Sequence, residues 1–310
     1  RKGQSIIPAI PPIPGTEITQ PTNQDLEEIF SPKKEGWLKI GNLLRNKEIE
    51  AKINLDKIVS RHLGILAMTG MGKSNLVSLI TKKISEVKGT VIIFDYHNDY
   101  TTLNIPNVNV IDAKINPRLL EADQFSEVLE IRENADVQQR VLRMSFTQEV
   151  KEAGEFWNKL EYEVASLVNS EDKKLKEIRT SAYRVQDIIE DAQRRFDDIL
   201  DPEVGNPMDY IKEGYTNIIN ISELSEKQAN VAMGFYLQQL LKDRKNATIA
   251  KHGKSKKQKD YKFFEPVFII LEEAHVFIPK DHDTAAKYWA AKIAREGRKF
   301  GVGLAIVSQR

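Results

Sequence analysis

Residues 67–74 combine the residue types of a phosphate-binding loop. They follow a short apolar run and precede a stretch with helical periodicity, so we expect a strand, a glycine-rich turn and a helix. In such a turn backbone N–H groups converge on phosphate oxygens, a lysine neutralises the β- and γ-phosphates, and a hydroxyl holds Mg²⁺. We therefore predict a bound nucleotide, held by these residues: Thr69, Gly70, Met71, Gly72, Lys73, Ser74 and Asn75.

One position departs from the usual pattern of this loop. Ala67 stands where the pattern has its first glycine, whereas Gly72, Lys73 and Ser74 follow the pattern. A plain tight turn is the alternative, but the succession of strand, turn and helix favours nucleotide binding. We expect Ser74 to be a ligand of the metal and Lys73 to be one of the catalytic residues.

Two consecutive acids, Glu272 and Glu273, follow the apolar run 267–271. At the carboxyl end of a parallel strand beside a phosphate loop, one acid can hold the water shell of Mg²⁺ and the next can orient the attacking water. We assign Glu272 to the metal and Glu273, as a catalytic residue, to the water. A solvated loop entrance is the alternative. For His275, a structural or relay role and a phosphate-sensing role both stay open.

A third acid, Asp95, ends the apolar run 91–95. Doubly wound sheets place such strand ends at the ligand crevice, so we expect Asp95 to lie near the Mg²⁺ as a metal ligand, or near the attacking water. An Asx turn that starts the following loop is the alternative.

Polar side chains flank the apolar run 302–307. Gln309 follows it, where P-loop ATPases contact the γ-phosphate, and we count it among the catalytic residues. Arg295 and Arg298 precede it and are candidates for contact with phosphate, DNA or a neighbouring subunit, with simple exposure to solvent as the alternative. Lysines also cluster between residues 251 and 262, where a DNA-contacting loop and an ordinary surface loop both fit the sequence.

The composition excludes several classes of protein. With 46 Lys and Arg against 45 Asp and Glu, the net charge of +1 creates no field over the whole molecule that would attract a polyanion. The absence of cysteine excludes a disulfide framework, a thiolate metal site and a cysteine nucleophile. No apolar run reaches the roughly 20 residues of a membrane span, and no signal-peptide pattern opens the sequence. We expect a cytoplasmic protein without membrane contact.

Apolar runs separated by helical segments predict an α/β fold with a mostly parallel sheet. The strands are expected at 63–67, 91–95, 267–271 and 302–307, with a weaker one at 217–221. The length fits about two domains, or one with an insertion, and the chain resembles a piece of a longer protein. We expect these parts: a proline-rich linker over 1–25, short strands within 26–60, a core over 61–114 and 211–310, and an inserted helical subdomain over 115–210.

The inserted segment shows two apolar seams with helical spacing. One runs from Leu175 to Ile199, and the other runs from Val150 to Leu167 in the preceding helix. We expect two or three helices to pack on each other through these seams, as core rather than as a cofactor site.

Taken together, these motifs resemble the HerA ATPases, within the wider HerA/FtsK group of DNA translocases. The resemblance covers about residues 20–310. It rests on the phosphate loop and on these segments: Ser60-Arg61-His62, Phe94-Asp95-Tyr96-His97, Leu271-Glu272-Glu273-Ala274-His275, Arg295-Glu296-Gly297-Arg298-Lys299-Phe300-Gly301 and Ser308-Gln309-Arg310.

The resemblance implies a RecA-like P-loop ATPase core with a helical insertion, and a hexameric ring that holds ATP and Mg²⁺ between subunits. Such a ring translocates on duplex DNA beside a NurA-type nuclease in the resection of double-strand break ends. It also implies an arginine supplied in trans to the neighbour's ATP, for which Arg61 and Arg298 are the candidates. We expect the family's amino-terminal β-barrel to be missing here, with residues 26–60 corresponding at most to its edge.

Three other functions fit part of these motifs. A superfamily-2 helicase has a similar phosphate loop and Glu-Glu-Ala-His segment, but Lys73 and Glu273 lie farther apart than we expect in that class. A nucleotide-gated scaffold would bind ATP and turn it over slowly, and the water-orienting Glu273 argues against it. A small-molecule kinase lacks support, because nothing resembles an acceptor pocket or a lid. We therefore predict ATP hydrolysis that drives movement on duplex DNA.

Overall fold

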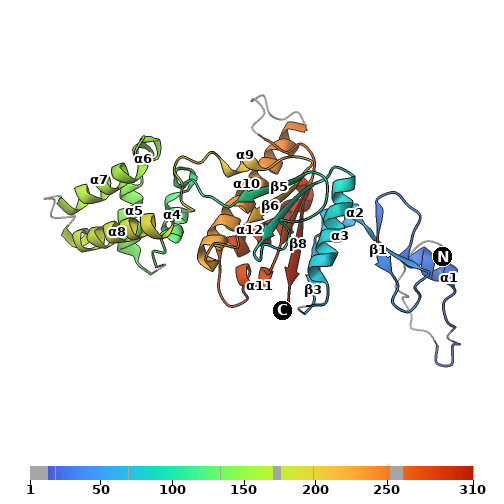
Figure 1. Cartoon of the computed structure of the whole chain (residues 1–310). Helices are drawn as coiled ribbons and strands as arrows, with labels where there is room; N and C mark the ends of the chain where they lie inside the picture. Colours follow the sequence, from blue (N-terminus) through green and yellow to red (C-terminus); the bar gives the residue numbers. More distant parts are fainter. Residues whose placement is uncertain are drawn as a thin grey trace.

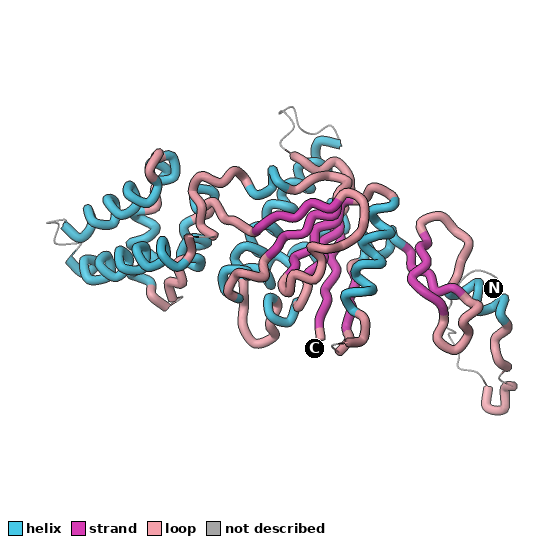
Figure 2. The backbone as a smooth tube through the Cα atoms, in the orientation of Figure 1, coloured by secondary structure: helices cyan, strands magenta, loops and turns pink. Residues whose placement is uncertain are grey.

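The structure, a computed structural model, has three parts that lie side by side (Figure 1). A sheet flanked by helices lies in the middle, a helical block at one end and a small two-stranded ribbon at the other (Figure 2). The described residues are 13–17, 19–68, 70–132, 134–169, 176–197, 199–251 and 261–309.

In the described part of the chain, six strands form the central sheet, and all neighbouring pairs in it run parallel. Their order across the sheet is β3-β8-β7-β4-β6-β5. They are β3 (Leu63–Leu66), β4 (Thr90–Asp95), β5 (Val108–Asp112), β6 (Thr216–Asn220), β7 (Val267–Leu271) and β8 (Val302–Ser308). This confirms the predicted α/β class and parallel sheet. The outer strand β5 was not predicted, because only Ile111 in it is buried and no continuous apolar run marks it.

Helices cover both faces of the sheet, and this is why its central strands are continuous apolar runs. In β4, Val91 and Ile93 belong to one buried cluster, whereas Ile92 and Phe94 belong to the cluster on the opposite face. The first face carries α2 (Leu55–Arg61) and α3 (Lys73–Glu86), and the second carries α10 (Glu226–Lys251) and α12 (Ala285–Glu296).

The helical block follows β5 and returns to the sheet at β6. Its elements are η1 (Pro117–Leu119), α4 (Ala122–Val128), α5 (Asp136–Ser145), α6 (Gln148–Glu152), α7 (Phe156–Asn169), α8 (Lys176–Arg195) and α9 (Pro207–Tyr210). The predicted seam from Ile178 to Ile199 is buried, and Leu175 lies outside the described residues. The range 115–210 of the inserted subdomain stays a prediction. None of the described helices is both long and apolar enough to span a bilayer.

The second predicted seam belongs to two helices. The prediction of one helix from Val150 to Leu167 is wrong, because α6 ends at Glu152 and α7 begins at Phe156. Gly154 lies between them, and glycine is among the residues least suited to a helix interior. The break leaves backbone carbonyls without helical amides as donors.

Arg118 supplies donors for those carbonyls. Its guanidinium donates to the carbonyl oxygens of Lys151 and Ala153 in the turn between α6 and α7, and to that of Pro202 in the segment that returns to the sheet. It also pairs with Glu203 at 2.7 Å. One side chain thus ties the entry, the internal turn and the exit of the helical block.

The amino-terminal part contains α1 (Asn23–Phe30) and an antiparallel pair of strands, β1 (Trp37–Asn42) and β2 (Glu50–Asn54). Both strands lie within residues 26–60, and the division of the chain into the predicted parts stays a prediction. The predicted linker over 1–25 lies partly outside the described residues.

Gly303 in β8 lets α2 lie directly on the sheet. A Cβ at this position would lie 2.7 Å from the Cα and the carbonyl oxygen of Val59, so the backbone of α2 would have to shift. We expect Gly303→Ala to lower the free energy of unfolding by about 1–3 kcal/mol, measured by chemical denaturation. The control is Gly64→Ala in neighbouring β3, where no atom lies within 4 Å of the added Cβ. Equal losses in the two variants would contradict this packing.

Candidate functional site

The residues predicted to bind and cleave a nucleotide converge where the carboxyl ends of neighbouring parallel strands meet. The phosphate loop follows β3, Asp95 ends β4, Glu272 and Glu273 follow β7, and Gln309 follows β8. We call this the carboxyl edge of the sheet, and it lies near the label C in Figure 1. The fold therefore brings together residues that lie far apart in the sequence.

The phosphate loop has a backbone shape that its glycines allow. Gly70 and Gly72 have left-handed φ angles of 79° and 84°, which other residues rarely adopt. Because α3 begins at Lys73, the amides of its first turn have no acceptor within the helix and can donate to phosphate oxygens. Thr69, also predicted here, lies outside the described residues. The other predicted loop residues fall in two groups: Met71 and Asn75 are exposed, and Lys73 and Ser74 are half-buried.

Asp95 is fully buried and organises the loop after β4. Its Oδ1 accepts the N–H of Asp99 at 3.0 Å, and its Oδ2 accepts that of Tyr100 at 2.9 Å. Burial raises the pKa of Asp95, and the two amide hydrogen bonds oppose this shift. Because backbone amides engage both oxygens, the geometry favours the turn interpretation of Asp95 over direct coordination of a metal.

Tyr100, Glu272, Ser74 and Asp99 meet beside the phosphate loop. The Tyr100 hydroxyl donates to Glu272 at the end of β7, and the Ser74 hydroxyl donates to Asp99 Oδ2 at 3.4 Å. Burial raises the pKa of Glu272, and the hydrogen bond from Tyr100 opposes this shift. Burial and the nearby Glu272 charge raise the pKa of Tyr100 above its usual value, so its phenol stays a donor at neutral pH. Sequence reasoning gave no role to Asp99 or Tyr100.

Glu273 is buried beside Glu272 and has a left-handed φ of 44° at the start of α11 (Ala274–Phe277). Its Oε1 accepts a hydrogen bond from Gln309 Nε2 at 2.9 Å, and its Oε2 lies 3.2 Å from His275 Nδ1. His97 Nε2 lies 4.0 Å from Oε1. Polar side chains from three segments therefore surround this carboxylate. The predicted contact between Gln309 and a γ-phosphate stays a prediction.

The arginines singled out in the sequence lie at the opposite edge of the sheet. Arg61 ends α2 directly before β3, and Arg298 lies in η3 (Gly297–Phe300) directly before β8. The length of a strand therefore separates each of them from the carboxyl edge of its own chain. Their side chains are exposed, as is that of Arg295.

His62 fixes the backbone next to Arg61. Its Nδ1 accepts the N–H of Leu304 at 3.1 Å, so Nε2 carries the proton and donates to the carbonyl of Ala294, also at 3.1 Å. Burial lowers the pKa of His62, which keeps Nδ1 available as an acceptor. The end of α2 is thereby fastened to β8 and to α12.

The lysine cluster between 251 and 262 is described only at its ends, because residues 252–260 lie outside the described part of the chain. Lys262 Nζ donates to the carbonyls of Met208 and Asp209 at 2.7 Å each, and burial lowers its pKa. Lys262 therefore fastens α9 instead of facing a ligand.

The residues of the carboxyl edge suit a nucleotide with Mg²⁺. Open space lies where Cβ atoms at Gly70 and Gly72 would be, so phosphate can approach the loop backbone closely. Ser74 offers a hydroxyl oxygen, its partner Asp99 offers a carboxylate, and Glu272 offers a second carboxylate at the end of β7. Because Mg²⁺ binds through one or two protein ligands, with waters and phosphates completing its shell, this set is sufficient.

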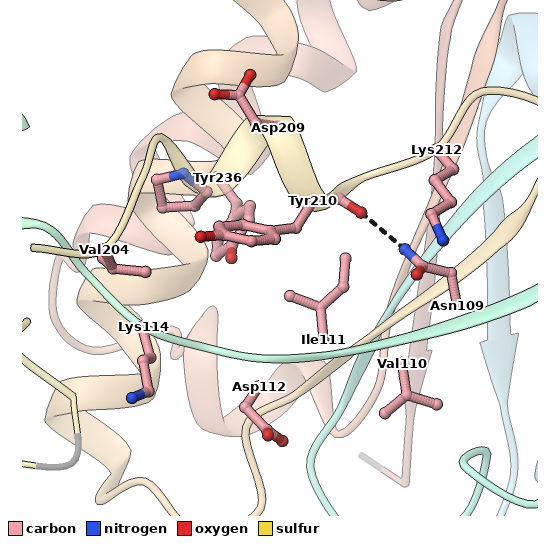
Figure 3. Close-up of a pocket in the computed structure, with 11 residues that line it drawn as sticks. Asn109, Val110, Ile111, Asp112, Lys114, Val204, Asp209, Tyr210, Lys212 and Tyr236 are labelled. Atoms are coloured by element: carbon pink, nitrogen blue, oxygen red, sulfur yellow. Dashed lines mark hydrogen bonds between the residues drawn. The ribbon is translucent and has the colours of Figure 1, made fainter.

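A pocket of about 450 Å³ lies elsewhere, along the outer strand β5 (Figure 3). Its lining includes Tyr210 and Tyr236, and Asn109 donates to the carbonyl of Tyr210 at 2.8 Å. In the strand order β5 stands at the opposite end from β3, which leads into the phosphate loop. We therefore assign this pocket no part in the nucleotide site.

The sequence of this chain matches a known protein family. Residues 38–240, well over half of the chain, match the family described as "Helicase HerA, central domain". The chain belongs to the HerA family. A "DNA double-strand break repair helicase HerA" from Sulfurisphaera tokodaii is 42% identical over 98% of this chain and 61% of the relative. A "Probable DNA double-strand break repair helicase HerA" from Methanocaldococcus jannaschii is 31% identical over 99% of this chain and 69% of the relative.

These HerA relatives confirm the resemblance inferred from the motifs, and the chain spans about three fifths of the length of the S. tokodaii protein. Two solved structures share the fold. VirB4 of Thermoanaerobacter pseudethanolicus has a TM-score of 0.59 at 16% identity, over 89% of this chain and 78% of that one. The plasmid coupling protein TrwB, in complex with ADP and Mg²⁺, has a TM-score of 0.52 at 12% identity, over 93% and 70%.

The buried carboxylate of Glu272 should reduce the stability of this HerA chain. Because the folded-state pKa is raised, the folded chain binds this proton more tightly than the unfolded chain, so the contribution of Glu272 to stability falls as pH rises through that pKa. We expect Glu272→Gln, which still accepts from Tyr100, to raise the melting temperature at pH 7 by about 2 °C or more. The gain should shrink as the pH approaches about 4.

The control for this prediction is Glu86→Gln, which alters an exposed pair with Lys83 and should change stability little. Thermal unfolding followed by circular dichroism at several pH values measures both variants. A Glu272→Gln variant less stable than the parent at pH 7 would contradict the account.

Proposed function

We propose that this HerA chain hydrolyses ATP and uses the energy to move on duplex DNA. The observation that carries the proposal is the position of Glu273, a buried acid held by polar side chains at the same sheet edge as the phosphate loop. A scaffold that only binds a nucleotide has no use for such an acid. Membership of the HerA family argues against the superfamily-2 alternative.

Each group at the carboxyl edge has a role in this reaction. Lys73 and the loop amides bind and orient the triphosphate. Ser74 and Glu272 would hold Mg²⁺, which when bound neutralises charge on the phosphates. Glu273 orients the water that attacks the γ-phosphorus, and Gln309, which donates to Glu273, reports the state of the γ-phosphate to the end of β8.

We further propose that a second copy of the chain completes the site. Arg61 and Arg298 lie at the amino ends of strands whose carboxyl ends carry the phosphate loop and Gln309. An arginine at that edge therefore reaches a nucleotide only on another copy. A head-to-tail arrangement in which one edge faces the next repeats around a closed ring.

The finer parts of the proposal rest on the family. The names of the relatives support a role in the repair of DNA double-strand breaks. The resemblance to HerA ATPases supports a hexameric ring in the cytoplasm that acts beside a NurA-type nuclease in end resection. We propose these properties for the whole protein, with residues 115–210 as the inserted subdomain of each subunit.

Variants of Lys73 and Glu273 test the proposed hydrolysis. We expect Lys73→Ala to reduce turnover at least about 100-fold by removing the charge that stabilises the phosphates. Glu273→Gln should keep nucleotide affinity but retain bound ATP without hydrolysing it. Lys82→Ala, on the exposed side of the same helix α3, is the control and should turn over ATP normally. A Glu273→Gln variant with the parent's rate would refute the assignment of the water-orienting acid.

Mixing two inactive variants tests whether the arginine acts in trans. In an equal mixture of Arg61→Ala and Glu273→Gln subunits, about a quarter of the interfaces combine an intact Glu273 with an intact Arg61. We therefore expect the mixture to recover ATP hydrolysis. A mixture of Lys73→Ala and Glu273→Gln is the control, because both residues serve the same face of the interface and no intact site can form. Mixtures with Arg298→Ala show which arginine is used, and no recovery with either arginine variant would contradict action in trans.

A further inference from the structure

Tyr100 joins the core of the protein to the candidate site. Its side chain is 1% exposed and belongs to the buried cluster between α3 and the sheet, together with Val77 and Ile93. Its hydroxyl leaves that apolar cluster and donates to Glu272 at the end of β7. Ser74, in the first turn of α3, donates to Asp99, the residue that precedes Tyr100 in the same loop.

Packing alone does not account for the hydroxyl. A phenylalanine would fill the same volume between α3 and the sheet without burying a polar group, and burying a hydroxyl costs free energy unless it has a partner. The Tyr100 hydroxyl has its partner on another element, and that partner is the buried carboxylate of Glu272. Hydrogen bonds to charged groups are stronger than bonds between neutral groups.

The loop after β4 holds Tyr100 in this position. Asp95 accepts the backbone N–H groups of Asp99 and Tyr100, so the loop closes tightly on the end of β4. Because β4 and β7 are neighbours, with Phe94 opposite Leu271, this loop lies beside the end of β7. The Tyr100 hydroxyl is thereby delivered to Glu272 with little freedom to move.

We propose that Tyr100 is a positioning residue whose hydroxyl aims the Glu272 carboxylate at the Ser74 side of the site, and so sets how strongly Mg²⁺ tightens nucleotide binding. This inference rests on the proposed nucleotide site but adds a residue that acts through Glu272, without contact of its own to the nucleotide. Without the hydroxyl, Glu272 keeps its charge but loses the bond that fixes its direction. Binding of Mg²⁺ must then also fix the orientation of this carboxylate, and the loss of its freedom reduces the gain in affinity.

The experiment measures the affinity for a fluorescent, non-hydrolysable ATP analogue in Mg²⁺ and in EDTA. The ratio of the two dissociation constants gives the gain in affinity from Mg²⁺. The proteins are the parent, Tyr100→Phe, Glu272→Gln and the double variant. Tyr236→Phe is the control, because Tyr236 is also 1% exposed but lies at the β5 pocket, away from the carboxyl edge.

We expect Tyr100→Phe to reduce the gain from Mg²⁺ about tenfold, the size of one hydrogen bond to a charged group, with the affinity in EDTA unchanged. The double variant should lose no more than Glu272→Gln alone, because Tyr100 acts through Glu272. Tyr236→Phe should match the parent. Unchanged affinity in EDTA also shows that each variant folds with an intact phosphate loop.

Either of two results with Tyr100→Phe would overturn the inference while leaving the proposed function intact. One is a Tyr100→Phe variant with the parent's gain from Mg²⁺, and the other is an equal loss of affinity in Mg²⁺ and in EDTA, which would make Tyr100 a support of the loop. A double variant weaker than Glu272→Gln would refute action through Glu272. A parent that binds no nucleotide at all would refute the proposed function as well.

Discussion

Two carboxylates at the ends of neighbouring parallel strands impose the central constraint on this structure. The register of β4 and β7 sets Phe94 opposite Leu271, so the acids that follow, Asp95 and Glu272, come to the same edge, and both are buried there. Buried carboxylates need donors, because desolvation otherwise makes their charge costly. The backbone amides after β4 donate to Asp95, and the Tyr100 hydroxyl donates to Glu272. The hydrogen bonds that these two acids need therefore determine the conformation of the loop after β4. That loop in turn forms the part of the site beside Ser74.

The same parallel sheet separates the candidate groups into two sets. The phosphate loop, the acids and Gln309 lie at the carboxyl edge, whereas Arg61 and Arg298 lie at the amino edge. Neither the loop nor the arginines can change edge without reversing a strand. A reaction that uses both sets would therefore need a second copy of this HerA chain, which is the assembly that we propose.

Much of this arrangement could be predicted from the sequence, because strands buried on both faces are continuous apolar runs and the phosphate loop has a distinctive local pattern. The features that escaped prediction depend on distant partners. The outer strand β5 is half exposed and shows no such run, and the break at Gly154 is stabilised by the guanidinium of Arg118. Likewise, the Tyr100 hydroxyl donates to Glu272, which lies at the end of another strand. Lys262 belongs to a lysine cluster in the sequence, but its ammonium donates to the carbonyl of Met208 and so stabilises the fold.

The most direct test of a site completed between copies is steady-state ATP hydrolysis by the whole protein over a range of concentrations, with and without blunt duplex DNA. We expect turnover per subunit to rise with protein concentration, because only assembled copies bring an arginine edge to a nucleotide. We expect a further rise when duplex DNA is present. A turnover per subunit that is independent of concentration, down to concentrations where the protein is monomeric, would contradict a site completed between copies.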